Sequence, residues 1–127
     1  MGCGGVGTLI ATILSQSGHD VVVLDSDPES FRNLSEELKS KAVVGDGTLR
    51  QDLEAVGIDE AEVFVAVSSS DTANAMASQM AKHVFQVDKV ICRIDDPASC
   101  AMYAGLGLDV VSATQVVSGL IVDKVNG

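Results

Sequence analysis

Three glycines at the start of the chain have the spacing of a phosphate-binding turn. Gly2, Gly4 and Gly7 form the pattern G-x-G-x-x-G within the stretch MGCGGVGTLI. Such glycines let a backbone turn approach a pyrophosphate at a helix N-terminus, where free N–H groups and the helix dipole favour an anion. The pattern is weak evidence by itself, because it should follow a β-strand and open a helix, and only Met1 precedes it here. A glycine-rich N-terminus that merely looks like this turn is the alternative.

An acidic residue further along the chain strengthens the nucleotide interpretation. Asp25 follows Gly7 by 18 positions and ends the apolar stretch 21–24. A carboxylate at the end of that strand can accept hydrogen bonds from a ribose diol, and it repels a 2′-phosphate. A tight strand-to-helix turn followed by a coincidental acid is the structural alternative. The glycines and Asp25 together favour a nucleotide site.

Two further residues, Asp46 and Ser68, end the next two predicted strands. Ligands of open α/β sheets bind outside the carboxyl ends of the strands, so both residues are candidates for the site, although Asp46 is equally placed to cap a helix. Arg93 lies within a strand near the same edge, where it either faces a nucleotide or pairs with Asp95, Asp96 or a neighbouring subunit. The candidate nucleotide-binding residues are Gly2, Cys3, Gly4, Gly5, Val6, Gly7, Asp25, Ser26, Asp46, Gly47, Ser68 and Arg93.

The elements that must position these residues alternate along the chain. Predicted strands cover residues 21–24, 42–44, 63–67, 89–94 and 108–111, and predicted helices cover 7–17, 28–38, 48–57, 71–85, a segment from 97, and 114–125. Strands that are apolar throughout and separated by helices predict a Rossmann-like, doubly wound α/β fold with a parallel sheet. The first strand of that fold is central, in the order 3-2-1-4-5-6, and this chain lacks it. We expect the glycine motif to be genuine and its strand to have been lost from the start of the chain.

Local signals predict helix ends and core faces. Asp27 and Asp96 each precede a proline and are predicted N-caps. Thr48 and Gln51 have the spacing of a capping box, and Ser70 and Asp71 are both candidate caps for the helix predicted over 71–85. The face that the first helix is predicted to bury consists of Leu9, Ile10, Ile13 and Leu14.

Composition excludes several classes of function. The net charge of −10 disfavours nucleic acid and anionic membrane surfaces as partners. No apolar run is long enough for membrane insertion, so we expect one cytoplasmic domain over residues 1–127. Cys3, Cys92 and Cys100 lack C-x-x-C spacing, which predicts buried or half-buried free thiols and neither disulfides nor a metal site. No catalytic constellation and no P-loop stand out, so an enzyme is not expected.

The motifs together resemble the N-terminal nucleotide-binding domain of bacterial and archaeal Trk/Ktr potassium-uptake regulators, the KTN/RCK or TrkA-N type. The resemblance covers nearly the whole chain through the stretches GCGGVG, SGHDVVVLDSDPE, VVGDGT, EAEVFVAVSSSDTAN, VICRIDDP and LGLDVVSAT. It implies a Rossmann fold that binds NAD(H) or adenine nucleotides. It also implies cytoplasmic rings that gate a membrane potassium channel or transporter.

Carried over by position, the resemblance puts phosphates over residues 2–7, ribose on Asp25, the adenosine side near Asp46 and Ser68 at the rim. Asp71 and Asn74 match the D-x-x-N segment of the family, and their role is left open. Many members have Arg where this chain has Gly5, so we rank NAD(H), AMP or ADP above ATP. All of these rank above NADP because of Asp25. The small C-terminal domain of the family is absent from residues 1–127.

Three interpretations follow from these expectations. The first is a nucleotide-sensing regulatory domain of a Trk/Ktr-type potassium-uptake system, acting as a homodimer or larger ring on a membrane transporter or channel subunit. The second is a cofactor-binding fragment of an NAD-dependent oxidoreductase, and the third is an RCK-type domain that serves another cation transporter or an antiporter. The helices predicted to mediate self-association carry Ala73, Ala75, Met76, Ala77, Met80 and Ala81, and Val116, Val117, Leu120, Ile121 and Val125.

Overall fold

The structure is a computed structural model that describes all 127 residues, and it has the expected doubly wound α/β arrangement. The strands are β1 (Val23–Asp25), β2 (Ala42–Val44), β3 (Val63–Ala66), β4 (Lys89–Arg93) and β5 (Asp109–Val111). The helices are α1 (Gly5–Gln16), α2 (Glu36–Lys39), α3 (Arg50–Ala55), α4 (Asp71–Gln79), α5 (Pro97–Gly105) and α6 (Ala113–Asn126). Short turns η1 (Pro28–Phe31) and η2 (Ile58–Glu60) precede α2 and β3, and the π-helical turn η3 (Met80–Val84) extends α4.

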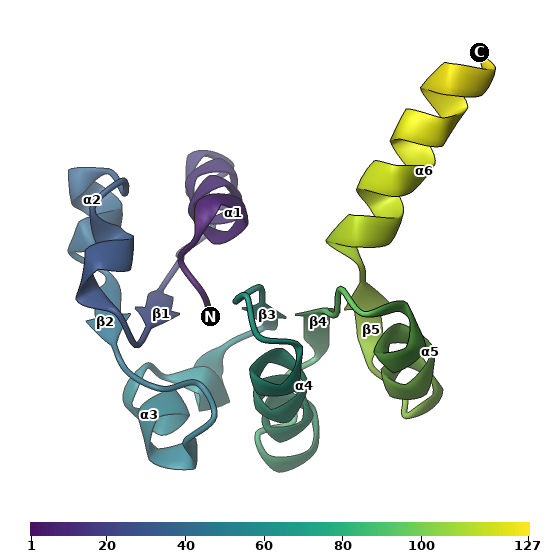
Figure 1. The fold of residues 1–127 in the computed structure, drawn as a ribbon. Helices are drawn as coiled ribbons and strands as arrows, with labels where there is room; N and C mark the ends of the chain where they lie inside the picture. The colour runs from purple at the N-terminus through teal and green to yellow at the C-terminus, as the bar shows by residue number, and fades with distance from the viewer.

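The five strands form two parallel sheets. One sheet has the order β1-β2 and the other has the order β3-β4-β5, with Val23 opposite Ala42, Val63 opposite Lys89 and Ile91 opposite Asp109. Helices α1 and α2 lie on one side of the strands, and α3, α4 and α5 lie on the other (Figure 1). These neighbours agree with the predicted order 3-2-1-4-5-6, with β2-β1 on one side of its central position and β3-β4-β5 on the other.

The first two residues bridge the two sheets where that central strand would run. The amide of Gly2 donates to the carbonyl oxygen of Leu24 at 2.8 Å. The amino group of Met1 donates to Val65 O at 2.8 Å, and Val67 N donates to Met1 O at 2.9 Å. Burial lowers the pKa of this amino group to about 6, against the opposing effect of the Asp25 and Cys3 charges.

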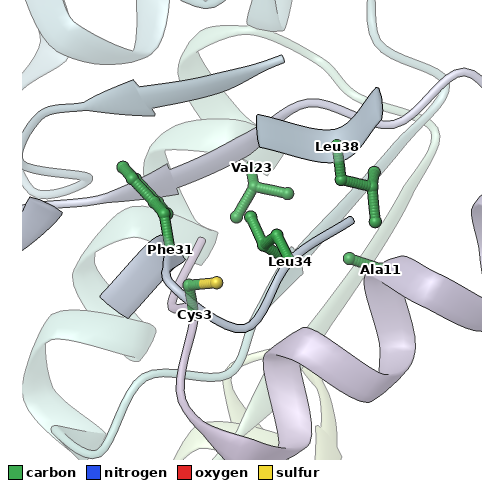
Figure 2. Close-up of a cluster of buried hydrophobic side chains, with 6 residues drawn as sticks. All are labelled: Cys3, Ala11, Val23, Phe31, Leu34 and Leu38. Atoms are coloured by element: carbon green, nitrogen blue, oxygen red, sulfur yellow. The ribbon is translucent and has the colours of Figure 1, made fainter. Parts of the chain in front are cut away.

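The core consists of small clusters that tie helices to strands. One cluster joins the glycine segment to α1, β1 and the η1–α2 region through Cys3, Ala11, Val23, Phe31, Leu34 and Leu38 (Figure 2). A second cluster joins β1 to the other sheet through Leu24, Leu53, Ile58, Ala81, Val87 and Val90. The second cluster therefore reinforces the connection that Met1 and Gly2 make through the backbone.

Several local expectations are confirmed. Asp27 caps η1 by accepting from Glu29 N, and Asp96 caps α5 by accepting from Ser99 N. The thiols of Cys3 and Cys92 are buried and that of Cys100 is half-buried, and all are free.

The predicted core face of α1 is wrong at two of its four positions. Leu9 and Ile13 are exposed and Ile10 and Leu14 are half-buried, whereas the fully buried positions of this helix are Gly7 and Ala11. Gly7 lies directly against the backbone of Gly2, so the small side of α1 is the one that can approach the rest of the protein.

Two helix predictions are wrong. The helix predicted over 28–38 is interrupted, because Ser35 accepts from Leu38 N and starts α2. The predicted capping box of Thr48 and Gln51 does not form, since α3 begins at Arg50 and Thr48 N donates to the Asp46 carboxylate. Of the two candidate caps of α4, Ser70 is the one that caps it, by accepting from Ala73 N.

The last helix, α6, extends away from the strands (Figure 1). Its large apolar side chains are all more than half exposed: Val116, Val117, Leu120, Ile121, Val122 and Val125. None of the helices has both the length and the hydropathy required to cross a bilayer.

Replacing Leu53 with alanine tests the cluster that joins the sheets. Leu53 is 0% exposed, and Leu53→Ala is expected to lower the free energy of unfolding by about 3 kcal/mol through lost burial and a residual cavity. Leu9→Ala is the matched control, because Leu9 is 60% exposed, and its effect should stay below about 0.5 kcal/mol. Urea unfolding followed by circular dichroism measures both. Equal losses from the two variants would contradict this description of the core.

Candidate functional site

The outer glycines of the motif are required by the fold. Gly2 has a φ of +96°, and a Cβ placed on it would lie 2.5 Å from the amide nitrogen of Ser68. A Cβ on Gly7 would overlap the carbonyl oxygen of Gly2. The first position therefore needs a left-handed backbone in a tight turn, and the last needs a close helix-to-loop approach.

The inner glycines are not required by any contact within the protein. A Cβ on Gly4 or Gly5 would meet no atom within 4 Å, and Gly4 has an ordinary φ of −80°. No side chain caps α1 and its first turn carries no acid, and the N–H groups of Gly5, Val6 and Gly7 have no protein acceptor. Helices α2, α4, α5 and α6 each have a side-chain cap. The surface over Gly4 and Gly5 is thus free backbone with a positive dipole end.

Asp25 lies against this glycine segment. Its carboxylate accepts from Cys3 N at 2.8 Å through one oxygen and from Asp27 N at 2.9 Å through the other. Cys3 is also buried in the cluster of Figure 2. Asp25 therefore fixes the glycine loop to the end of β1, and each oxygen retains a second lone-pair direction that a ribose hydroxyl could use.

A cavity of about 290 Å³ lies beside the loop. Its lining consists of Cys3, Gly4, Gly5, Asp27, Glu29, Ser30, Arg32 and Asn33. This volume lies just below the usual range for small-molecule sites. Sequence analysis found the loop side of this cavity and missed Arg32, whose only sequence signal is its position shortly after the acid that ends β1.

Asp46 and Gly47 follow β2, and Gly47 lies against the side chain of Met1. The Asp46 carboxylate accepts from the hydroxyl and the amide of Thr48, and these hydrogen bonds lower the pKa of Asp46. Gly47 is buried, and a Cβ placed on it would lie 2.7 Å from both Cγ and Sδ of the Met1 side chain. Neither residue lines the cavity, so their contact with a nucleotide remains a prediction.

Ser68 and Arg93 belong to a polar network centred on Asn74. Asn74 is 0% exposed. Its amide oxygen accepts from Ser68 N and the Ser68 hydroxyl, and its amide nitrogen donates to the carbonyl oxygens of Ser68 and Arg93. The D-x-x-N segment thereby holds the ends of β3 and β4 together. Ser68 also packs beside Gly2, so this network abuts the glycine loop.

Arg93 points toward the start of the last helix. Its guanidinium contacts the Asp95 carboxylate at 2.9 Å, which raises the pKa of Arg93 and lowers that of Asp95. Asp95 also accepts from Ala113 N, the first residue of α6. Asp71 accepts from the amides of Asp95 and Asp96. Of the alternatives offered for Arg93, the structure shows the ion pair with Asp95.

The structure therefore brings part of the predicted set together. Gly2, Cys3, Gly4, Gly5, Gly7, Asp25 and Ser68 meet around one loop, while Arg93 lies beyond Asn74. Val6 and Ser26 are exposed, at the first turn of α1 and in the turn after β1. No group of three or more His, Cys, Asp or Glu side chains is arranged to hold a metal ion.

Comparison with known proteins identifies close relatives in sequence. The model of the TrkA-N domain matches residues 1–114. The Trk system potassium uptake protein TrkA of Streptomyces coelicolor is 42% identical over 115 residues, which cover 91% of this chain and 52% of that protein. A Trk system potassium uptake protein TrkA homolog of Pyrococcus abyssi is 38% identical over 97 residues, which cover 76% of this chain and 43% of that protein. The chain spans about half the length of these relatives.

Solved structures share the fold at lower sequence identity. The TrkA-N domain of inner membrane protein ybaL from Escherichia coli has a TM-score of 0.83 at 17% identity, covering 96% of this chain and 90% of that one. The Kef CTD of Shewanella denitrificans in an AMP-bound form has a TM-score of 0.78 at 24% identity, covering 98% and 77%. At these identities the likeness establishes the fold alone.

Alanine should destabilise the protein at an outer glycine of the motif and should not destabilise it at an inner one. Gly7→Ala is expected to destabilise the protein by about 2 kcal/mol, because the added methyl group forces the loop and α1 apart. Gly5→Ala should leave stability unchanged or raise it by up to about 1 kcal/mol, because the helix position is open and alanine restricts the unfolded chain. Thermal and urea unfolding of both variants provide the measurement. Destabilisation by Gly5→Ala as large as that by Gly7→Ala would contradict the assigned roles.

Proposed function

The chain belongs to the TrkA-N domain family, and we propose on that basis that it is the nucleotide-sensing regulatory domain of a potassium-uptake system. The observation that carries the proposal is the open backbone of Gly4 and Gly5 at the uncapped start of α1, with Asp25 beside it. The relatives named as potassium uptake proteins favour this function over a fragment of an oxidoreductase.

Phosphate binding rests on the backbone of the glycine loop. The N–H groups of Gly5, Val6 and Gly7 lack protein acceptors, and the dipole of α1 favours an anion there. Glycine at positions 4 and 5 leaves space in which a phosphate can approach the main chain. In this proposal the domain binds the nucleotide reversibly and does not react with it. It therefore acts as a sensor of the nucleotide.

The choice of nucleotide follows from charge. Asp25 lies where it can accept from a ribose diol and repel a 2′-phosphate, which favours NAD(H), AMP or ADP over NADP. A helix N-terminus supplies about half a positive charge, and Gly5 adds no cation. The net charge of −10 further disfavours ATP. A structural neighbour described as AMP-bound is consistent with an adenine nucleotide.

Regulation requires that the bound nucleotide favour one arrangement of the domain over another. We place the domain on the cytoplasmic side, paired with further copies of itself and acting on a membrane potassium transporter or channel subunit. A nucleotide can shift this equilibrium only by the difference between its affinities for the two arrangements. Of the two helices predicted to mediate self-association, the one over 71–85 buries Ala75, Ala77 and Ala81 within the protein itself, so we assign the contact between copies to the exposed apolar side chains of α6.

Titration calorimetry with NADH, AMP, ADP, ATP and NADP tests the nucleotide proposal. NADH, AMP or ADP should bind more tightly than ATP, and NADP should bind most weakly. Gly4→Ala should weaken binding about tenfold or more, because its methyl group keeps the phosphate from N–H groups whose hydrogen bonds to a charged acceptor are strong.

Gly119→Ala is the control for that variant, since Gly119 lies in α6 and its Cβ would also meet open space. Unfolding midpoints establish that each variant is folded. Tighter binding of ATP than of both NADH and AMP would overturn the ranking, and unchanged binding by Gly4→Ala would remove the loop from the site.

Analytical ultracentrifugation tests self-association through α6. Leu120→Asp is expected to shift the protein toward monomer at micromolar concentration, because a carboxylate would be buried in an apolar contact. Ser118→Asp adds the same charge to an exposed polar position of the same helix and should change association less. A wild-type protein that remains monomeric at high micromolar concentration would count against this surface.

A further inference from the structure

Arg32 is the only cationic side chain that lines the cavity beside the glycine loop. Its side chain makes no ion pair or hydrogen bond with the protein. Of the eight lysine and arginine side chains in the chain, five make such a contact. The five engaged cations are Lys39, Lys41, Arg50, Lys82 and Arg93. The other two without a partner, Lys89 and Lys124, lie outside the lining of this cavity.

The backbone at Arg32 is held in a defined position relative to the loop. Phe31 and Leu34, on either side of it, are buried in the cluster that also contains Cys3 (Figure 2). Arg32 is therefore carried on a segment packed against the same core as the loop. Its exposed side chain can sample the space between the two while its Cα stays in place.

Two acidic residues share the lining without neutralising Arg32. Asp27 accepts from Glu29 N as the cap of η1. Glu29 is exposed, and neither carboxylate comes within ion-pairing distance of the guanidinium. A guanidinium with five donors and no acceptor beside an uncapped helix N-terminus is suited to an oxyanion.

We propose that Arg32 binds the phosphate group held over Gly4 and Gly5, supplying the side-chain cation that position 5 does not. This inference rests on the proposed function and adds a residue that sets specificity for phosphate. The planar fork of arginine matches two phosphate oxygens, while the loop amides bind the remaining oxygen. Because the cation comes from the segment after η1, a 5′-phosphate would be held from both sides of the cavity.

Calorimetric titration with 5′-AMP, 2′-AMP and adenosine tests the role of Arg32. Arg32→Gln is expected to weaken 5′-AMP binding about tenfold, because a charge-assisted contact is lost, and to leave adenosine binding unchanged. Arg32→Lys should recover part of the loss, since lysine keeps the charge and loses the fork. Lys89→Gln is the control, because it removes the same charge from a site outside the cavity.

The outcomes separate this inference from the function on which it rests. If the wild-type protein binds none of these ligands, the proposed function itself fails. If it binds 5′-AMP and Arg32→Gln binds equally well, or no worse than Lys89→Gln, the role of Arg32 is overturned. If Arg32→Gln weakens the binding of 2′-AMP alone, the contact with the loop-bound phosphate is contradicted. The same holds if Arg32→Gln weakens the binding of 5′-AMP and adenosine equally. Unfolding midpoints confirm that Arg32→Gln, at an exposed position, remains folded.

Discussion

The backbone bridge made by Met1 and Gly2 is the constraint on which the arrangement of this protein depends. Three hydrogen bonds, to Leu24, Val65 and Val67, join the two sheets at their carboxyl ends. At the amino ends of β1 and β3, by contrast, Val22 and Val63 remain 47% and 45% exposed. The sheets are therefore connected through the backbone at the same edge where the glycine loop turns into α1. A shift of this bridge would move the loop, Asp25 and Ser68 together.

A continuous series of contacts leads from this loop to α6. Gly2 packs beside Ser68, Asn74 bonds both Ser68 and the carbonyl oxygen of Arg93, and Arg93 pairs with Asp95, which accepts from the first amide of α6. The central member is a buried amide whose polar atoms are both bonded, and such networks hold a single geometry well. This series of contacts connects the proposed nucleotide site at the loop to the helix that we assign to contacts between copies.

The fold could be predicted from the sequence because it depends on local patterns. The alternation of apolar strands with helices can be recognised without knowledge of tertiary packing. The same holds for the helix caps, because Asp27 and Asp96 each precede a proline. The face of α1 could not be predicted in the same way. Its apolar stripe indicated Leu9 and Ile13, but the close approach of Gly7 to Gly2 decided which side was buried. The loop and Asp25 were found from spacing, whereas Arg32 joins them only through the three-dimensional packing of Phe31 and Leu34 against Cys3.

We propose that the open backbone at the start of α1 binds the phosphate of an adenine nucleotide. A titration of ¹⁵N-labelled protein with AMP, followed by heteronuclear NMR, reports on each backbone amide of the loop separately. We expect the amide signals of Gly4, Gly5 and Val6 to shift most and to saturate together, with smaller shifts at Asp25 and Asp27. Saturable shifts confined to residues outside the loop and the cavity, with Gly4 and Gly5 unmoved, would contradict it.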